Sequence, residues 1–101
     1  MPRIDMTFRH DLPQEEALRR IKRLLTDVQA RFADKVSDVR ERWNGSVGKF
    51  SFSVMGFSTN GELVVGPSTV LLTGKLPPLA TFFRGKIESV IREQATALLR
   101  P

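Results

Sequence analysis

The architecture of this chain follows from one segment, Val36 to Lys75, which reads VSDVRERWNGSVGKFSFSVMGFSTNGELVVGPSTVLLTGK. It is rich in β-branched and aromatic residues, and apolar side chains occupy alternate positions, as at Phe50, Phe52 and Val54. Turn signals divide it at Asn44-Gly45, Met55-Gly56 and Gly66-Pro67-Ser68. Four strands joined by such short turns predict an antiparallel meander. Within it, Gly61 is typical of a bulge or a weak point in a strand.

The segments on either side of the meander supply a fifth strand and two helices. Arg3 to Arg9 alternates apolar and polar residues, which predicts a strand that adds at an edge of the sheet. A long helix is expected over Pro13 to Ala33, opened by a capping box of Asp11 and Gln14. A second helix follows Pro77-Pro78 and runs to the C-terminus. The apolar stripes predicted to face the core are Ala17, Leu18, Ile21, Leu24, Leu25, Val28 and Phe32, and then Leu79, Phe82, Phe83, Ile87, Val90, Ile91, Leu98 and Leu99.

Two helices with one apolar face each are enough to cover one side of the sheet. The sequence therefore predicts an α+β fold: a two-layer sandwich with a five-stranded, mostly antiparallel sheet and two helices on one face, in the order β-α-β-β-β-β-α. Residues 1–101 are expected to form a single domain around one core. Side chains such as Phe8, Trp43 and Phe52 are expected to fill the space between the layers.

Composition and charge limit the class of protein. Hydrophobic residues make up 41% of the 101 residues and charged residues 27%, which is typical of globular proteins. No apolar run approaches the roughly 18 residues of a membrane-spanning helix, and the first ten residues lack the layout of a signal peptide. With no cysteine there is no disulfide or thiolate chemistry, so a cytoplasmic location is expected. The net charge of +5 favours acidic partners or surfaces.

Residues that could perform catalysis are sparse. His10 is the one histidine, and no cysteine, serine motif or carboxylate accompanies it at a recognisable spacing, which favours a solvated or turn-bonding role. A zinc site needs three or four nitrogen, sulfur or carboxylate ligands held together, and the glycines form no nucleotide-phosphate motif. The sequence thus predicts no catalytic residues, no metal site, no cofactor and a non-enzymatic protein.

The most concentrated charge lies on the polar side of the first helix. It consists of Arg19, Arg20, Lys22 and Arg23 and could contact phosphates, anionic lipid or an acidic protein. No aromatic residue interleaves with these side chains, so nucleic-acid binding is not favoured, and a solvated helix face is the preferred interpretation. An i,i+4 ion pair between Glu15 and Arg19 is expected on the same side.

A second candidate surface lies on the sheet. Val64 and Leu71 are predicted to fall near each other on the side opposite the core. One exposed apolar pair is common, whereas a larger covered patch would imply a homodimer or a partner protein.

The order of elements also matches a known family. The residues that carry the similarity are Ile4-Asp5-Met6 with Arg9-His10-Asp11-Leu12 and Glu15-Glu16-Ala17, Trp43-Asn44-Gly45 with Phe50-Ser51-Phe52, Gly61-Glu62-Leu63, and Leu79 with Gly85-Lys86-Ile87-Glu88 and Ile91. On these residues the chain resembles the polyhydroxyalkanoic acid system proteins, over nearly its whole length. The resemblance implies an accessory protein of polyester storage granules, with the granule or a granule-associated protein as its partner, and it brings no catalytic signature.

A helix lying across a curved antiparallel sheet is also similar to a shortened helix-grip architecture, found in lipid- and polyketide-binding proteins. This likeness implies a second hypothesis, a binding protein for an acyl or other apolar ligand held between helices and sheet. Weak nucleic-acid binding through the basic helix is a third.

Overall fold

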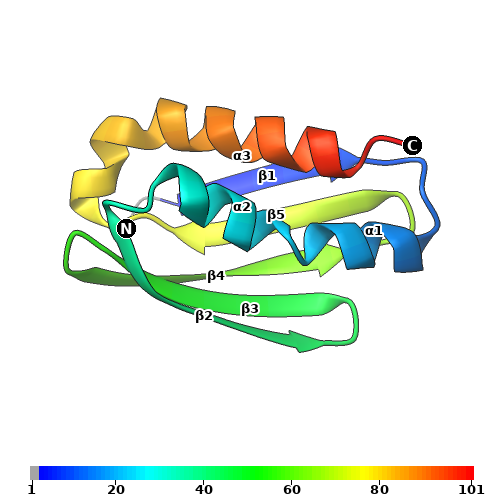
Figure 1. Cartoon of the computed structure of the whole chain (residues 1–101), viewed down its shortest axis with the longest axis horizontal. Helices are drawn as coiled ribbons and strands as arrows, with labels where there is room; N and C mark the ends of the chain where they lie inside the picture. The colour runs from blue at the N-terminus through cyan, green and yellow to red at the C-terminus, as the bar shows by residue number, and fades with distance from the viewer. Residues whose placement is uncertain (1–2) are drawn as a thin grey trace.

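The computed structural model describes residues 3–101, which form two layers (Figure 1). The elements in chain order are β1 (Arg3–Arg9), α1 (Gln14–Ile21), α2 (Leu24–Arg31), β2 (Val36–Asn44), β3 (Val47–Val54), β4 (Phe57–Val65), β5 (Thr69–Lys75), the 3-10 helix η1 (Pro78–Phe83) and α3 (Arg84–Leu98). All neighbouring strands pair antiparallel, in the order β1-β5-β4-β3-β2. The helices cover one face, which confirms the predicted α+β sandwich and places β1 at the edge beside β5.

The core forms where the alternating strands meet the helical stripes. Ile4, Met6 and Phe8 of β1 point to the helix side and are buried. Ile21 and Leu24, from the helical layer, are almost fully buried against the sheet side of the core. Each aliphatic side chain buried in this way contributes roughly 1.5–3 kcal/mol, so this cluster holds the two layers together.

The turns of the meander follow the glycines, with one shift of position. Met55 and Gly56 both have positive φ, +51° and +87°, as a two-residue hairpin turn requires. The predicted turn at Asn44-Gly45 is displaced by one residue, because Asn44 still pairs with Val47 and ends β2. Gly45, at φ +61°, therefore turns together with Ser46.

The predicted irregularity at Gly61 lies elsewhere in the sheet. Gly61 pairs without interruption with Phe50 on one side and Gly74 on the other. The register shifts instead on β2, between Ser37 and Arg40, where Asp38 takes a φ of +54°. An Asp tolerates this left-handed conformation better than most residues, and the bulge bends the edge strand.

The expected long helix is two helices, because the chain turns at Lys22 and Arg23. The Arg23 amide donates to the Arg20 carbonyl, a tighter bond than the α-helical one. The predicted capping box is also wrong: α1 begins at Gln14 after Pro13 without a side-chain cap. The Gln14 side-chain amide instead donates to the Val65 carbonyl at 2.8 Å, which ties the start of α1 to β4.

The C-terminal helical segment begins with a 3-10 turn and exposes two of its aromatic residues. Phe82 is 84% exposed and Phe83 48%, although both belong to the predicted core stripe. The tighter 3-10 turn changes which side chains face the sheet, whereas in α3 the stripe residues Val90 and Ile91 are buried as predicted. The side chain of Leu79 lies outside the described residues.

The face of the sheet away from the helices carries a short apolar row. Val64 pairs directly with Leu71 and with Val47, and alternation places the three on the open face. Leu71 is exposed, and Val47 and Val64 are half-buried. The predicted apolar pair is thus extended by Val47, on the neighbouring strand.

Candidate functional site

The space between the layers contains an apolar cavity of about 420 Å³. Its walls come from α2 (Leu25 and Val28), from β3 (Phe52 and Val54) and from the C-terminal helical segment (Phe83 and Ile87). The expectation that side chains fill this space is therefore wrong at this end of the molecule. The volume lies in the lower part of the roughly 300–1,000 Å³ range of small-molecule pockets.

One reason for the cavity is Gly74, a lining residue whose partner on the neighbouring strand is also a glycine, Gly61. Gly61 and Gly74 are directly paired, and strand alternation places both on the helix side. The Phe50 ring covers Gly61, since a Cβ built there would lie 2.5 Å from the ring. At Gly74 the nearest atoms to such a Cβ are the Asn60 carbonyl oxygen at 3.4 Å and the Gly61 Cα at 3.6 Å. No side chain covers Gly74 within that distance, which leaves room above the sheet.

A second reason is the break in the helical layer. α1 packs against β4, whereas α2, beyond the turn at Lys22 and Arg23, packs chiefly against α3. The stripe residues change accordingly, because Ala17 and Ile21 are fully buried while Leu25 and Val28 are half-buried. The side chains of α2 therefore line the cavity rather than fill the layer beneath them.

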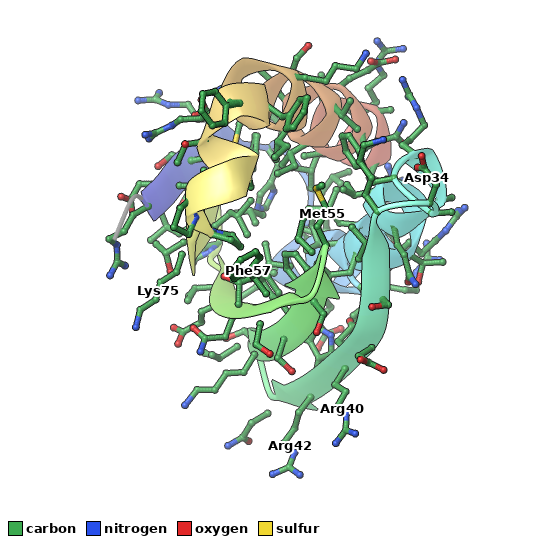
Figure 2. The ribbon with its side chains drawn as sticks, turned by 90° about the vertical axis from the view of Figure 1, so that its left-hand side faces the viewer. Asp34, Arg40, Arg42, Met55, Phe57 and Lys75 are labelled. Atoms are coloured by element: carbon green, nitrogen blue, oxygen red, sulfur yellow. The ribbon has the colours of Figure 1, made fainter. Side chains whose placement is uncertain are left out.

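The exposed lining residues Asp34, Met55 and Lys75 lie at the end of the molecule shown in Figure 2, so the cavity opens there. This end is formed by η1, the β3–β4 turn with Met55, and the connection from α2 to β2 with Asp34. The Met55 amide donates to the Lys35 carbonyl at 3.1 Å, which joins the last two segments. The opening is thus framed by short connections, which are the parts of a fold most able to move aside for a ligand.

Charged side chains occur among the cavity-lining residues, and most of them are basic. They are Arg31, Lys35, Lys75 and Lys86 against the single acid Asp34. The Lys35 ammonium lies 3.0 Å from the Asp34 carboxylate, and its hydrogen bond lowers the pKa of that group. Arg31 and Lys86 take part in no ion pair found within residues 3–101.

Large apolar side chains are also exposed around this end. Met55 and Phe57 belong to the β3–β4 hairpin, and Phe82 and Phe83 to η1, with exposed fractions between 47% and 84%. Met55 and Phe83 line the cavity themselves. An exposed apolar cluster of this kind, next to an apolar cavity, is a feature of binding surfaces.

The opposite end of the interlayer space is closed by hydrogen bonds. His10 is 6% exposed, and its Nδ1 accepts a hydrogen bond from the Leu12 amide at 3.2 Å. Its Nε2 lies 3.1 Å from the Gly66 carbonyl oxygen, which can only accept, so Nε2 carries the proton. The imidazole therefore joins the strand-to-helix connection to the β4–β5 turn.

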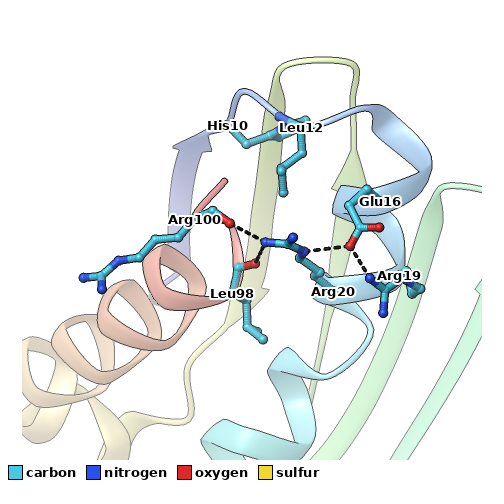
Figure 3. A network of polar contacts seen from close by, with 7 residues as sticks. All are labelled: His10, Leu12, Glu16, Arg19, Arg20, Leu98 and Arg100. Atoms are coloured by element: carbon cyan, nitrogen blue, oxygen red, sulfur yellow. Dashed lines mark hydrogen bonds and ion pairs between the residues drawn. The ribbon is translucent and has the colours of Figure 1, made fainter.

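The basic residues singled out on the first helix lie near this closed end, and several are engaged (Figure 3). Arg20 Nε donates to the Glu16 carboxylate at 2.8 Å, and Arg20 Nη1 donates to the carbonyls of Leu98, at 3.2 Å, and Arg100. Arg19 pairs with the same carboxylate, so the partner of Arg19 is Glu16 and not Glu15. Hydrogen bonds from Arg20 and Arg19 lower the pKa of Glu16.

The other two residues of the predicted basic cluster also have local contacts. Arg23 Nη2 lies 3.8 Å from Asp27, and Lys22 Nζ lies 5.7 Å from the centre of the Trp43 ring. The four basic side chains are therefore engaged locally, two with Glu16, one with Asp27 and one with Trp43, rather than directed at one point. A partner for these residues remains a prediction, as does one for Val64 and Leu71.

Within residues 3–101 there is no group of three His, Cys, Asp or Glu side chains that could hold a metal ion. No helix in the same range has the length and apolar character needed to cross a bilayer.

The preferred sequence interpretation, a filled core, missed the cavity, although the second hypothesis of an apolar ligand between helices and sheet allowed for one. The basic residues at its opening were not singled out. The available signal was the pair of glycines, because Gly61 and Gly74 are interior residues of strands with no side chain to pack. Their pairing, and the presence of a covering ring over only one of them, follow from the register.

The chain was compared with protein families, with solved structures and with curated proteins. The model of a family described as "Putative polyhydroxyalkanoic acid system protein" matches residues 4–99. Among solved structures, the crystal structure of TTHA0849 from Thermus thermophilus is similar, with 16% sequence identity and a TM-score of 0.40 over 97% of this chain and 92% of that one. No curated protein shows significant sequence similarity.

Proposed function

Because the chain belongs to the polyhydroxyalkanoic acid system family, whose model spans nearly all of it, we propose that it is a non-enzymatic accessory protein of that system, located in the cytoplasm. It acts by holding an apolar chain, such as the acyl part of a hydroxyalkanoic acid, in the cavity between α2, α3 and the sheet.

The cavity carries this proposal. Its volume of about 420 Å³ is enclosed mainly by aliphatic and aromatic side chains, so an apolar chain gains by leaving water for it. At roughly 25 cal/mol per Å² of apolar area buried, even a short chain gains several kcal/mol before the entropy of its immobilisation is subtracted. Binding and release of such a chain require no nucleophile, metal or cofactor.

A neutral apolar fluorophore, N-phenyl-1-naphthylamine, provides a direct test. We expect the protein to enhance its fluorescence and methyl decanoate to displace it. Gly74→Val places a side chain into the free space above the sheet, where a Cβ meets only ordinary contacts, and should weaken binding of the fluorophore at least about tenfold. Thr73→Val is the matched control, because Thr73 neighbours Gly74 on β5 and points to the opposite face.

Two outcomes would defeat the cavity proposal. One is a protein that leaves the fluorophore dark at every concentration. The other is a Gly74→Val variant that is folded by circular dichroism and binds the fluorophore as tightly as the Thr73→Val variant.

The exposed apolar side chains around the opening favour a second candidate function, contact with the surface of the polyester granule. Phe82 is the most exposed of them, and it lies on η1 beside the cavity-lining Phe83. Co-sedimentation with purified polyester granules should fall markedly for Phe82→Ser, with little change in stability because the ring is already in water. Equal sedimentation of Phe82→Ser and of the open-face variant Leu71→Ser would argue against this candidate.

A further inference from the structure

We infer that the ligand of the cavity is an amphiphile, an apolar chain that ends in an anionic group held by basic side chains at the opening. This inference rests on the proposed function, since it names the chemical class of molecule that the same cavity binds.

The first argument is that the buried residues of the cavity lining have apolar side chains. They include Phe50, Leu72 and Ile91. In the described part of the chain, every buried side-chain nitrogen or oxygen already has a hydrogen-bond partner. A polar or charged group placed deep in the cavity would therefore lose its hydration without compensation, which costs several kcal/mol. Any polar end of the ligand must stay at the opening.

The second argument is the sign of the charge at the opening. Arg31 ends α2, Lys35 lies in the connection to β2, and Lys86 lies in the first turn of α3, and all three line the cavity. Asp34 is the single acidic residue of the lining and is already paired with Lys35. Arg31 and Lys86 keep their charges free of the ion pairs found within residues 3–101. An anion at the opening would therefore lie near basic side chains from three segments of the chain.

The placement of Lys86 supports the same conclusion. α3 begins with Arg84 and Lys86 in its first turn and has no acidic residue there. Cations at the N-terminal end of a helix are repelled by the helix dipole, so this arrangement carries an electrostatic cost in the free protein. For Arg84 this cost is offset by Glu88, at 3.5 Å, and by the Arg3 carbonyl, at 2.7 Å. An anionic ligand would offset the electrostatic cost of placing Lys86 at this end of the helix.

The shared chemistry is a negative charge on an apolar chain. It is carried by the carboxylate of a free fatty or hydroxy acid, and equally by the phosphates of a coenzyme A thioester. Both have the same requirement for an apolar chain of limited length and a basic opening, and they differ in the number of charges at the head.

A displacement series separates charge from apolarity. The neutral fluorophore N-phenyl-1-naphthylamine is displaced at pH 8 with dodecanoate, methyl dodecanoate and dodecyltrimethylammonium, all below their micelle concentrations. We expect dodecanoate to bind roughly three- to tenfold more tightly than the ester, and the cation to bind most weakly, since exposed ion pairs contribute modestly. The advantage of dodecanoate should shrink when the salt concentration rises to about 0.5 M.

Charge reversal locates the site. The double variant Arg31→Glu/Lys86→Glu should abolish the preference for dodecanoate over methyl dodecanoate, because it weakens binding of the anion much more than binding of the neutral ester. The control Arg40→Glu/Arg42→Glu makes the same change in net charge on the edge strand β2, away from the opening (Figure 2), and should keep the preference. Dodecanoyl-coenzyme A is measured in parallel. Weaker binding of either anion to Arg31→Glu/Lys86→Glu supports the inference. The order of the two affinities for the wild type shows whether the head group is a carboxylate or a set of phosphates.

The failures of the two proposals are distinguishable. Displacement by all three dodecyl compounds with equal affinity would overturn the anionic head group and leave the cavity proposal standing. An equal loss of preference in both double variants would also overturn it, because the effect would then be one of net charge. Absence of displacement by every compound would overturn the proposed function itself.

Discussion

The two ends of the space between helices and sheet are built differently. At the end of α1, polar groups close the layer. Arg20 holds the C-terminal end of α3 (Figure 3), His10 joins the β4–β5 turn, and Gln14 donates to β4. At the end of α2 and η1, apolar side chains surround unfilled volume, and basic residues lie at its opening. The same two layers can thus be stabilised at one end by packing and hydrogen bonds while the other end is less tightly packed and leaves space for a ligand.

The largest expected difference between the ends is the cost of shortening a helix side chain. Ile21→Ala, at a fully buried position of α1, should lower the free energy of unfolding by roughly 2–5 kcal/mol. Val28→Ala, on the cavity-lining face of α2, should lower it by less than about 1 kcal/mol, because that side chain already borders free volume. Urea denaturation measures both. Equal losses would show that α2 packs as tightly as α1 and that the two ends do not differ.

The paired glycines sharpen the comparison at one point of the sheet. Gly61→Val should lower the free energy of unfolding by about 1–3 kcal/mol or more, because its Cβ would lie 2.5 Å from both the Phe50 ring and the Thr73 carbonyl oxygen. Gly74→Val should be nearly neutral, since its Cβ has room and valine favours a strand. Thermal unfolding of the two variants provides the measurement. A Gly74→Val variant as unstable as Gly61→Val would mean that the floor of the cavity is already filled.

The smallest expected effect is a difference in acid sensitivity between the ends. Arg20 and Arg19 hold the pKa of Glu16 below its ordinary value of 4.5. The unfolded chain therefore takes up this proton first as the pH falls. The stabilisation by Glu16 is fully present above about pH 4.5 and is lost as the pH falls through the folded-state pKa. At the open end, Lys35 lowers the pKa of Asp34, so the stabilisation by Asp34 is likewise lost as the pH falls. Asp34 has one basic partner where Glu16 has two.

Denaturation of Glu16→Gln and Asp34→Asn between pH 7 and pH 3 checks this expectation. Each variant should differ from the wild type at neutral pH and approach it in acid, with the larger change for Glu16. Curves for Glu16→Gln that run parallel to the wild type at every pH would show that the contacts with Arg20 and Arg19 contribute nothing in solution.

Most of the fold could be predicted because it depends on patterns that are local in the chain. Alternation identified the strands, Met55-Gly56 marked a tight turn, and Ala17, Ile21 and Leu24 at helical spacing marked the buried face. The errors arose where a local signal competes with a contact between segments that are distant in the chain. The Asp11–Gln14 capping pattern lost to a hydrogen bond between Gln14 and β4, a strand 51 residues away in sequence at Val65.

The candidate site could not be predicted in the same way. Leu25, Val28 and Phe83 belong to apolar stripes, and a stripe indicates burial without saying whether the space opposite is filled. Arg31 and Lys86 lie 55 positions apart in the chain, and their common place at the opening depends on how α2 and α3 pack together.

The amino-acid sequence by itself determined the order of strands and helices along the chain and most of the faces they bury, since periodicity and turn chemistry act within a few residues. It also determined the family to which the chain belongs. Only the tertiary structure decided that Gly61 is covered by an aromatic ring while Gly74 is not, that the first helix divides, and that basic side chains meet around an apolar space. These features depend on distances between elements, which are fixed only when the layers pack against each other.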